Sequence, residues 1–526
     1  MDKQIQFLLE NCPGISRIIT EKGHLTVLEY ATGFFDYRAR PIQPIDDFIE
    51  VVCKYSEGLL GRKNAELLEK CFGEKSVVLT ANHHGVSYKS ITLQGEIIFS
   101  LPGIFSGGKK TLPILPVLAC GIVPLSNCTF PRGIVLSREI EATVSPGEKK
   151  LLNLKFPLIP GSKSQCLVSL APPVGREQLN KAKNSVERHF GQGDLLACEK
   201  KVLLELFSEE YDSAEVLGQV DYSDQAVILN RRIWKRIFSP EVREDIPDIA
   251  YLEMERVVVS LLHRDLSNRE SLIYNILFEP SLQERVIGNL DGETGCWNQR
   301  KLVDLWSSID RHPTLSEAFR GCGTNFFCFA DTRGRRIPAL LDRGRGKPLL
   351  RGIAPGGKIS IPFTPEAIRN GLKKRLLLPG LFLSFATLAF ARGIKCIGGF
   401  LQVDYLPAMQ RGLIRSFVDL KQSDWVEKIA AVPTVNFLTG MNIAMSRYPN
   451  GDVRPSGAVE LIASGGLTAQ DLDRIKDISV FDANLSGLLE FYAEMVLGGK
   501  NIVPCLASIT NGEKQKVRSR LLEKEL

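Results

Sequence analysis

The chain has 526 residues, of which 44% are hydrophobic and 24% are charged, values that exclude a fibrous chain or one disordered over most of its length. Its 66 basic and 60 acidic residues leave a net charge of only +6, so composition offers no support for nonspecific nucleic-acid binding. Because the length exceeds what one hydrophobic core normally serves, we expect about two or three domains.

The first part, residues 1–172, is predicted to be an α/β domain with a mixed sheet. A helix is expected at residues 46–60, and short apolar runs at residues 76–81, 114–124 and 166–170 predict strands. Frequent prolines in the second half of this part predict short or edge strands joined by long loops.

The second part, residues 173–312, is predicted to be a helical domain or insertion, because several amphipathic segments follow one another. One of them, residues 248–265, carries Ile249, Leu252 and Val259 at spacings that place them near one another on a helix. We therefore expect a single helix there, packed against another element.

The third part, residues 313–526, is predicted to be an α+β domain with a charged C-terminal tail. Strands at residues 325–330 and 335–341 are expected to form a β-hairpin, with Gly334 in the left-handed conformation of its turn. The tail, residues 513–526, is expected to form a solvated helix.

Helix signals recur within this third part. Thr364 and Pro365 are typical of an N-cap and a first helical turn. Residues 376–391 predict a buried helix, because this apolar stretch is interrupted by proline and is shorter than the roughly 20 residues that cross a bilayer. A buried strand is expected at residues 394–403, and no transmembrane segment is predicted.

The cysteine pattern and the N-terminus indicate a compartment. Twelve cysteines are scattered without any Cys-x-x-Cys pair, which argues against a zinc module or a disulfide scaffold and favours reduced thiols. The N-terminal residues lack the basic start and the long apolar core of a secretory signal. We therefore expect a cytoplasmic protein.

The tetrapeptide Asn82-His83-His84-Gly85 follows the apolar run at residues 76–81 and holds two of the six histidines of the chain. Loops at the carboxyl ends of strands in open α/β sheets commonly carry functional side chains. With an unperturbed pKa of about 6.5, a histidine can take a proton near neutral pH. Either histidine is therefore a candidate general base, and the alternative for each is a structural histidine bonded to backbone.

Two resemblances arise at this loop. Residues 77–85 resemble the strand and the Asn-His element of glycerolipid acyltransferases, with Ser87 and Tyr88 near the position where that family has an aspartate. The His-His pair also resembles the opening of the motif of condensation-type and chloramphenicol-type acyltransferases, with Tyr88 and Lys89 where Asp and Gly follow. Both resemblances imply acyl transfer.

Basic residues suggest where an anionic substrate would bind. Arg132, in a turn after the second apolar run, could hold a carboxylate or a phosphate beside Asn82 and the histidines. A basic strip at residues 333–351, which includes Arg343, Arg345 and Lys347, could bind the phosphates of a carrier or a nucleotide. The alternatives are a structural Arg132 and a solvated strip.

These observations favour a biosynthetic transferase that moves an acyl or aminoacyl group to a small amine or hydroxyl, with His83 or His84 as general base. No metal or redox cofactor is required, and CoA or a carrier protein would supply a thioester donor. One alternative is a metal-dependent hydrolase with the two histidines as ligands and Glu96 or another carboxylate completing the site. Another is a membrane-peripheral or scaffold protein that uses residues 376–391 as an interfacial helix.

Overall fold

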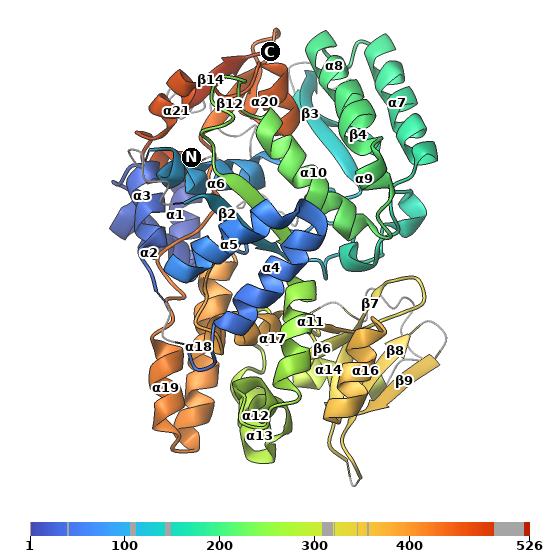
Figure 1. The fold of residues 1–526 in the computed structure, drawn as a ribbon, viewed down its shortest axis with the longest axis vertical. Helices are drawn as coiled ribbons and strands as arrows, with labels where there is room; N and C mark the ends of the chain where they lie inside the picture. The colour runs from blue at the N-terminus through green and yellow to red at the C-terminus, as the bar shows by residue number, and fades with distance from the viewer. Residues whose placement is uncertain are drawn as a thin grey trace.

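The computed structural model describes residues 2–38, 41–105, 112–141, 149–307, 319, 321–344, 346–354, 357–485, 487–488 and 520–526. Helices and several sheets of different types make up these residues (Figure 1), which confirms the predicted mixture of α/β and α+β structure. One large cluster of buried apolar side chains takes residues from all three predicted parts of the chain.

A four-stranded parallel sheet forms the centre of the molecule, in the order β11-β1-β2-β5. Its strands are β1 (Val77–Leu79), β2 (Ile114–Ala119), β5 (Asp248–Glu253) and β11 (Lys395–Ile397). Nearly all of their residues are buried, and strands that are covered on both faces read as continuous apolar runs. This is why the first two strands were recognisable in the sequence.

Helices from the N-terminal part surround this sheet. They are α1 (Asp2–Asn11), α2 (Pro13–Lys22), α3 (Val27–Phe35), α4 (Asp46–Leu60), α5 (Arg62–Glu74) and α6 (Ser90–Ile104). The predicted helix at residues 46–60 is thus confirmed as α4. Helices α4 and α5 pack against β5, and α5 and α6 pack against β2, so two of the central strands are covered by nearby segments (Figure 1).

The segment between β2 and β5 begins with a hairpin and short turns and continues as helices. Its elements are β3 (Gly133–Glu141), β4 (Lys149–Pro157), η1 (Gly161–Lys163), η2 (Val168–Leu170), α7 (Arg176–Gly191), α8 (Ala197–Glu205), the π-helix η3 (Leu206–Tyr211), α9 (Ala214–Leu217) and α10 (Tyr222–Arg236). The run at residues 166–170 contains the short helix η2, so the strand predicted there is wrong. Helix α10 packs against β5.

The single helix predicted at residues 248–265 is also wrong. Its first residues form β5, and only the remainder forms a helix, α11 (Met254–Asp265). Ile249 and Leu252 are buried in the parallel sheet, whereas Val258 and Leu262 are buried on the helix. An apolar spacing of three residues did not distinguish these two arrangements, because a fully buried strand has no polar alternation.

A five-stranded antiparallel sheet, in the order β10-β6-β7-β8-β9, lies beside the parallel sheet (Figure 1). Its strands are β6 (Phe327–Ala330), β7 (Arg336–Asp342), β8 (Leu349–Ala354), β9 (Gly357–Pro362) and β10 (Leu377–Pro379). The predicted hairpin is confirmed, with Gly334 at φ +72°. The helices that precede the sheet are α12 (Leu272–Phe278), α13 (Pro280–Asn289) and α14 (Gln299–Ser307).

The N-cap predicted at Thr364 is confirmed, because its hydroxyl accepts a hydrogen bond from the amide of Ala367 at the start of α16 (Pro365–Lys373). The stretch predicted as a buried helix at residues 376–391 is helical at residues 381–390, as α17 (Leu381–Phe385) and the π-helix η5 (Ala386–Phe390), whereas its first residues form strand β10. Among the described residues, no helix combines the length and the apolar character that a membrane crossing requires.

The chain then returns to the parallel sheet as β11, which is shorter than the strand predicted at residues 394–403. The remaining elements are α18 (Gln402–Asp419), α19 (Ser423–Ala430), β12 (Ala444–Arg447), β13 (Val453–Pro455), α20 (Ala458–Ala463), α21 (Ala469–Ile475) and β14 (Leu522–Glu525). Strand β14 pairs with β12, so the solvated helix predicted for the tail is wrong at these residues, and residues 513–519 lie outside the described part.

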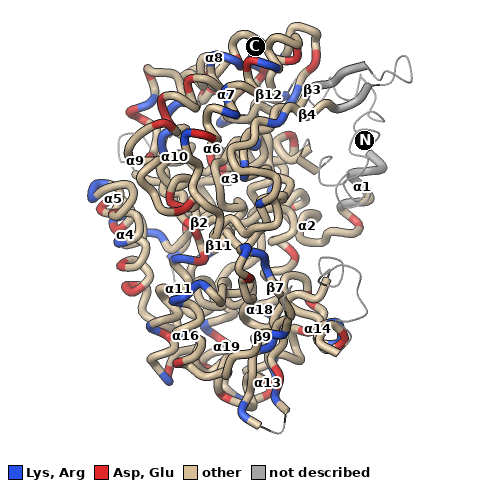
Figure 2. Tube along the Cα trace, turned by 90° about the vertical axis from the view of Figure 1, so that its right-hand side faces the viewer, with Lys and Arg blue, Asp and Glu red and all other residues tan. Residues whose placement is uncertain are grey.

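Lysine and arginine residues are interspersed with aspartate and glutamate residues along the chain trace in Figure 2. This distribution agrees with the small net charge of +6.

A second, small apolar cluster joins the loop after β2 to the antiparallel sheet through Ile122, Leu167, Cys328 and Leu378. The carboxyl end of β2 is therefore held against the neighbouring sheet.

Candidate active site

Loops that carry polar side chains meet where the central strands end. Because β1, β2 and β5 are parallel, the residues that follow them lie at the same edge of the sheet. The loop after β1 is tied to the loop after β2 by two backbone hydrogen bonds, from His84 N to Cys120 O at 2.8 Å and from Cys120 N to Asn82 O at 3.0 Å. Side chains far apart in the sequence are thus brought together.

Gly85 sets the path of the first loop. Its φ is +125°, and a Cβ built on it would lie 2.8 Å from Cβ of Pro131. A side chain at this position would therefore meet both backbone strain and a steric clash. Asn230 fixes the same loop from α10, because its amide donates to Gly85 O at 2.9 Å and its carbonyl oxygen accepts from Ser87 N at 2.8 Å.

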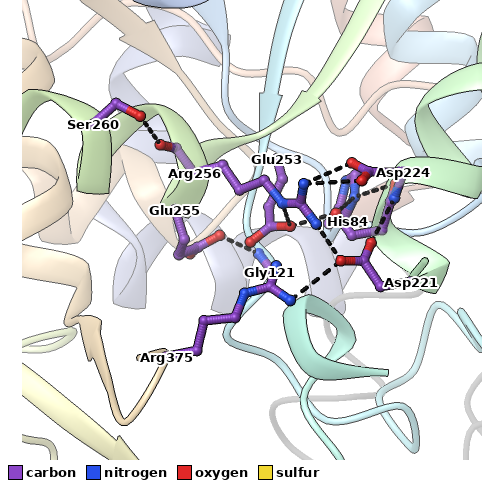
Figure 3. A network of polar contacts seen from close by, with 10 residues as sticks. His84, Gly121, Asp221, Asp224, Glu253, Glu255, Arg256, Ser260 and Arg375 are labelled. Atoms are coloured by element: carbon purple, nitrogen blue, oxygen red, sulfur yellow. Dashed lines mark hydrogen bonds and ion pairs between the residues drawn. The ribbon is translucent and has the colours of Figure 1, made fainter. Parts of the chain in front are cut away.

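The His84 ring is fully buried within a polar network that includes Glu253, Arg256 and Asp224 (Figure 3). Its Nε2 lies 2.9 Å from the Ser223 hydroxyl oxygen and 3.2 Å from the Ser223 carbonyl oxygen. The Ser223 hydroxyl in turn donates to the carboxylate of Glu253, at the end of β5. A carboxylate is therefore connected to the histidine through one serine.

These bonds determine the tautomer of His84. The single hydroxyl proton of Ser223 is directed to Glu253, so both Ser223 oxygens act as acceptors toward the ring. Nε2 must then carry the hydrogen, and Nδ1 keeps the lone pair of the neutral ring. Burial lowers the pKa of His84 from its usual 6.5, against the raising effect of Glu253. Nδ1 is buried and has no hydrogen-bond partner among the described residues.

Arg256, in the first turn of α11, balances the carboxylates around the histidine. Its guanidinium lies 3.2 Å from Glu253, 2.8 Å from Asp224 and 2.5 Å from Asp221. Arg375 reaches Asp221 from a neighbouring segment at 3.2 Å. Partial burial lowers the pKa of Arg256, but Tyr55 and the carboxylates of Glu253, Asp221 and Asp224 together raise it more, so this arginine stays charged and holds the carboxylates in place.

Glu255 forms a second polar group at the same edge. Its carboxylate accepts from Gly121 N at 2.6 Å and from the Cys120 thiol at 3.3 Å. Burial, and then the charge of Glu253, raise the pKa of Glu255 to about 7. Burial and Glu255 also raise the pKa of Cys120 well above its usual range, so this cysteine is a thiol near neutral pH and a poor nucleophile.

We expect the variant Glu255→Gln to gain stability relative to the wild type as the pH rises from about 5 to about 8. The pKa of Glu255 is raised from 4.5 to about 7, so the folded protein holds this proton more tightly than the unfolded chain does. The stability that this proton contributes is complete below pH 4.5 and is lost as the pH rises through about 7. Thermal unfolding of both proteins across this range measures the effect, and a difference in Tm that does not change with pH would contradict it.

The two other residues of the predicted loop have structural contacts. Asn82 is buried and donates from its side-chain amide to Glu96, which also accepts from the Ser87 hydroxyl at 3.4 Å. Burial raises the pKa of Glu96 to about 8. His83 is half-buried, and its carbonyl oxygen accepts from the Tyr251 hydroxyl at 2.9 Å. Glu96, the suggested third metal ligand, therefore faces Asn82 and Ser87.

Arg132 lies close to the histidine loop, because the preceding residue, Pro131, packs against Gly85. Its own guanidinium is directed elsewhere. It donates to Ile159 O at 3.2 Å and stacks 4.9 Å from the centre of the Phe130 ring. No carboxylate contacts it among the described residues, and its contacts stabilise the turn before β3.

The predicted basic strip is spread over the antiparallel sheet. Arg343 is exposed and lies 3.8 Å from Glu284, Lys347 is exposed, and Arg345 lies outside the described residues. Arg351 is paired with Asp342 at 2.6 Å. These residues are not part of the polar network around His84.

Sequence reasoning missed Ser223, Glu253 and Arg256. Two signals could have indicated them. The residues Asp221 and Ser223 stand at the start of α10, where polar side chains cap a helix, and Asp221 accepts from Asp224 N at 3.0 Å. Glu253 directly follows an apolar run, as the Asn82 loop does, but that run was assigned to a helix.

Within the part of the chain that the structure describes, no three His, Cys, Asp or Glu side chains are grouped as metal ligands. The side chains of the site provide a neutral histidine whose tautomer is set by a serine and a carboxylate, and a nearby carboxyl group with a pKa of about 7. Such groups can accept and donate protons near neutral pH.

No protein-family model, no curated protein and no solved structure matches this chain.

Proposed function

We propose that this protein is a biosynthetic transferase of the cytoplasm that moves an acyl or aminoacyl group from a thioester donor to a small amine or hydroxyl, with His84 as general base. The observation that supports it best is the chain of contacts from Glu253 through Ser223 to His84 Nε2, which leaves a lone pair on Nδ1. The two acyltransferase motifs that the loop resembles have an aspartate in their sequence, and here Glu253 is the carboxylate that orients the base.

In the proposed reaction, Nδ1 of His84 takes the proton of the acceptor as its nitrogen or oxygen attacks the thioester carbonyl carbon. The new C–N or C–O bond forms, the C–S bond breaks, and the proton on Nδ1 passes to the leaving thiolate. Glu253 stabilises the imidazolium that exists between these steps, through the Ser223 hydroxyl. His84 ends the reaction neutral, so one histidine suffices as base and acid.

This mechanism requires the acceptor substrate to reach Nδ1 of His84. The His84 ring is fully buried and stacks on Tyr251, with 6.1 Å between ring centres. A substrate can reach Nδ1 only when part of the covering loop moves.

The proposal is tested by comparing metabolites in a host that expresses the wild type, His84→Gln or His189→Gln. His189 is a matched control, because it is also bonded to a partner, Asp194, at 3.2 Å, but lies outside the network around His84. Compounds altered by the wild type are then supplied to purified protein with acyl-CoA thioesters, and release of free thiol is followed. We expect release with the wild type and the control only. Equal release by a folded His84→Gln variant would contradict the proposal.

A further inference from the structure

A cleft of about 640 Å³ lies beside the site, between the loop that precedes α14 and the antiparallel sheet. Ile122, two residues after Cys120, forms one wall, and Trp297 and Leu381 form others. The remaining polar lining includes Asn298 and Thr324. The cleft is large enough for a small organic molecule rather than a single ion.

Two cationic side chains line this cleft, Lys301 of α14 and Arg336 of β7. Both lower the pKa of the Cys322 thiol, against the larger rise that burial causes, so both charges act on the same side of the cleft. The Lys301 ammonium lies 3.0 Å from the position that a Cβ on Gly321 would take. Two segments that are distant in sequence thus bring positive charge to the same cleft.

Neither cation is neutralised by a carboxylate among the described residues, whereas several neighbouring arginines are. Arg335 is paired with Asp331 at 2.7 Å, and Arg351 with Asp342 at 2.6 Å. The carboxylate that lines the cleft, Glu293, lies 3.9 Å from Arg415 on α18. The side chains at the cleft therefore leave an excess of positive charge that an anion can balance.

The loops around these cations are held in a defined shape. A Cβ on Gly323, which has φ +65°, would lie 2.0 Å from the carbonyl oxygen of Cys296, so the two loops are in direct contact. Two of the first amides of α14 are already occupied, because Gln299 N donates to Asp291 at 2.7 Å and Lys301 N donates to Asn298 at 2.9 Å. Attraction for an anion thus comes from the two side chains and not from the helix terminus.

We propose that this cleft binds a phosphate-bearing small molecule, with its phosphate between Lys301 and Arg336 and its organic part against Trp297 and Leu381. A phosphate is favoured because it carries up to two negative charges and offers the paired oxygens that a guanidinium fork binds. This assignment does not depend on the role of His84. Because Ile122, two residues after Cys120, lines the cleft, a molecule bound there would lie near the edge of the parallel sheet.

The test is calorimetric titration of the full chain with pyrophosphate at low ionic strength, for the wild type, Lys301→Met, Arg336→Met and Arg333→Met. Arg333 is the matched control, since it is exposed on the same hairpin but does not line the cleft. We expect binding by the wild type and the control, and an affinity at least about tenfold weaker for each cleft variant. Added salt should weaken the wild-type affinity as well.

Three outcomes would overturn the assignment. They are the absence of pyrophosphate binding by the wild type at millimolar concentrations, an equal loss of affinity in Arg333→Met, and equally tight binding of malonate, which would identify a dicarboxylate site. Lys301 and Arg336 are exposed, so the thermal unfolding of the variants should match that of the wild type. That measurement separates a lost contact from a misfolded protein.

Discussion

Replacement of His84 by glutamine is expected to lower kcat of the proposed transfer by about two to four orders of magnitude. Glutamine can still donate a hydrogen bond to Ser223, but it cannot accept and release a proton. The wild-type histidine is held by Ser223 at 2.9 Å with its lone pair on Nδ1, so its loss removes the base while most packing is kept. Steady-state kinetics on a substrate found by the metabolite comparison measures the effect.

The dependence of the transfer rate on pH distinguishes a catalytic base at His84 from a histidine with a structural role. Because burial lowers the pKa of His84, the base form predominates at neutral pH, and the wild-type rate should fall only as the pH drops below about 6.5. Glu253 raises this pKa, so Glu253→Gln should move the fall in rate to still lower pH. A profile that is identical in both proteins would mean that His84 does not transfer the proton.

The variant Ser223→Ala tests whether the connection between Glu253 and His84 contributes to the proposed reaction. Ser223 is a positioning residue, and its removal disconnects Glu253 from the ring while the carbonyl of residue 223 remains 3.2 Å from Nε2. We expect a smaller loss of kcat than for His84→Gln, with little change in KM. A variant that loses substrate affinity and keeps its kcat would place Ser223 at the substrate rather than behind the histidine.

Arg392→Met is expected to destabilise the folded protein by about 3 to 5 kcal/mol. The Arg392 guanidinium is fully buried and lies 2.7 Å from Asp47 on α4 and 3.0 Å from Asp265 at the end of α11. It also donates to Thr387 O at 3.1 Å. Asp265 is only 2% exposed, so removal of the arginine leaves a buried negative charge that water cannot solvate.

Urea unfolding followed by circular dichroism measures this destabilisation as a lower midpoint. Arg264→Met is the matched control, because Arg264 pairs with Glu50 at 2.9 Å with both side chains exposed. Such a pair contributes at most about 1 kcal/mol. Equal shifts of the midpoint in the two variants would show that burial does not set the strength of the Arg392 contacts.

Local signals in the sequence were sufficient for several elements. The run before Asn82 is a buried strand, Gly334 adopts positive φ in a hairpin turn, and Thr364 caps a helix. Each of these features depends on residues within a few positions of one another, so its physical cause is present in a short stretch of sequence. The mixture of α/β and α+β structure follows from the same signals.

Two other predictions were wrong because the conformation of each stretch depends on which elements bury it. Only the complete fold determines those neighbouring elements. Residues 248–265 are a strand followed by a helix, and residues 376–391 are a strand followed by an α-helix and a π-helix. Each stretch begins with a short, mostly apolar run that forms the strand, and such a run is compatible with either conformation until its neighbours are known. In both stretches the strand pairs with a segment distant in sequence, as β5 does with β2 and β10 with β6.

The sequence by itself determined that a histidine pair stands where a buried strand ends, with a glycine next to it. The tertiary structure decided what that pair can do. Only His84 meets Ser223, which is 139 residues away in the chain, and Ser223 meets Glu253 on a third segment. Contacts between such distant residues arise from the order of strands in the parallel sheet and the packing of α10 against β5, and no local periodicity encodes them.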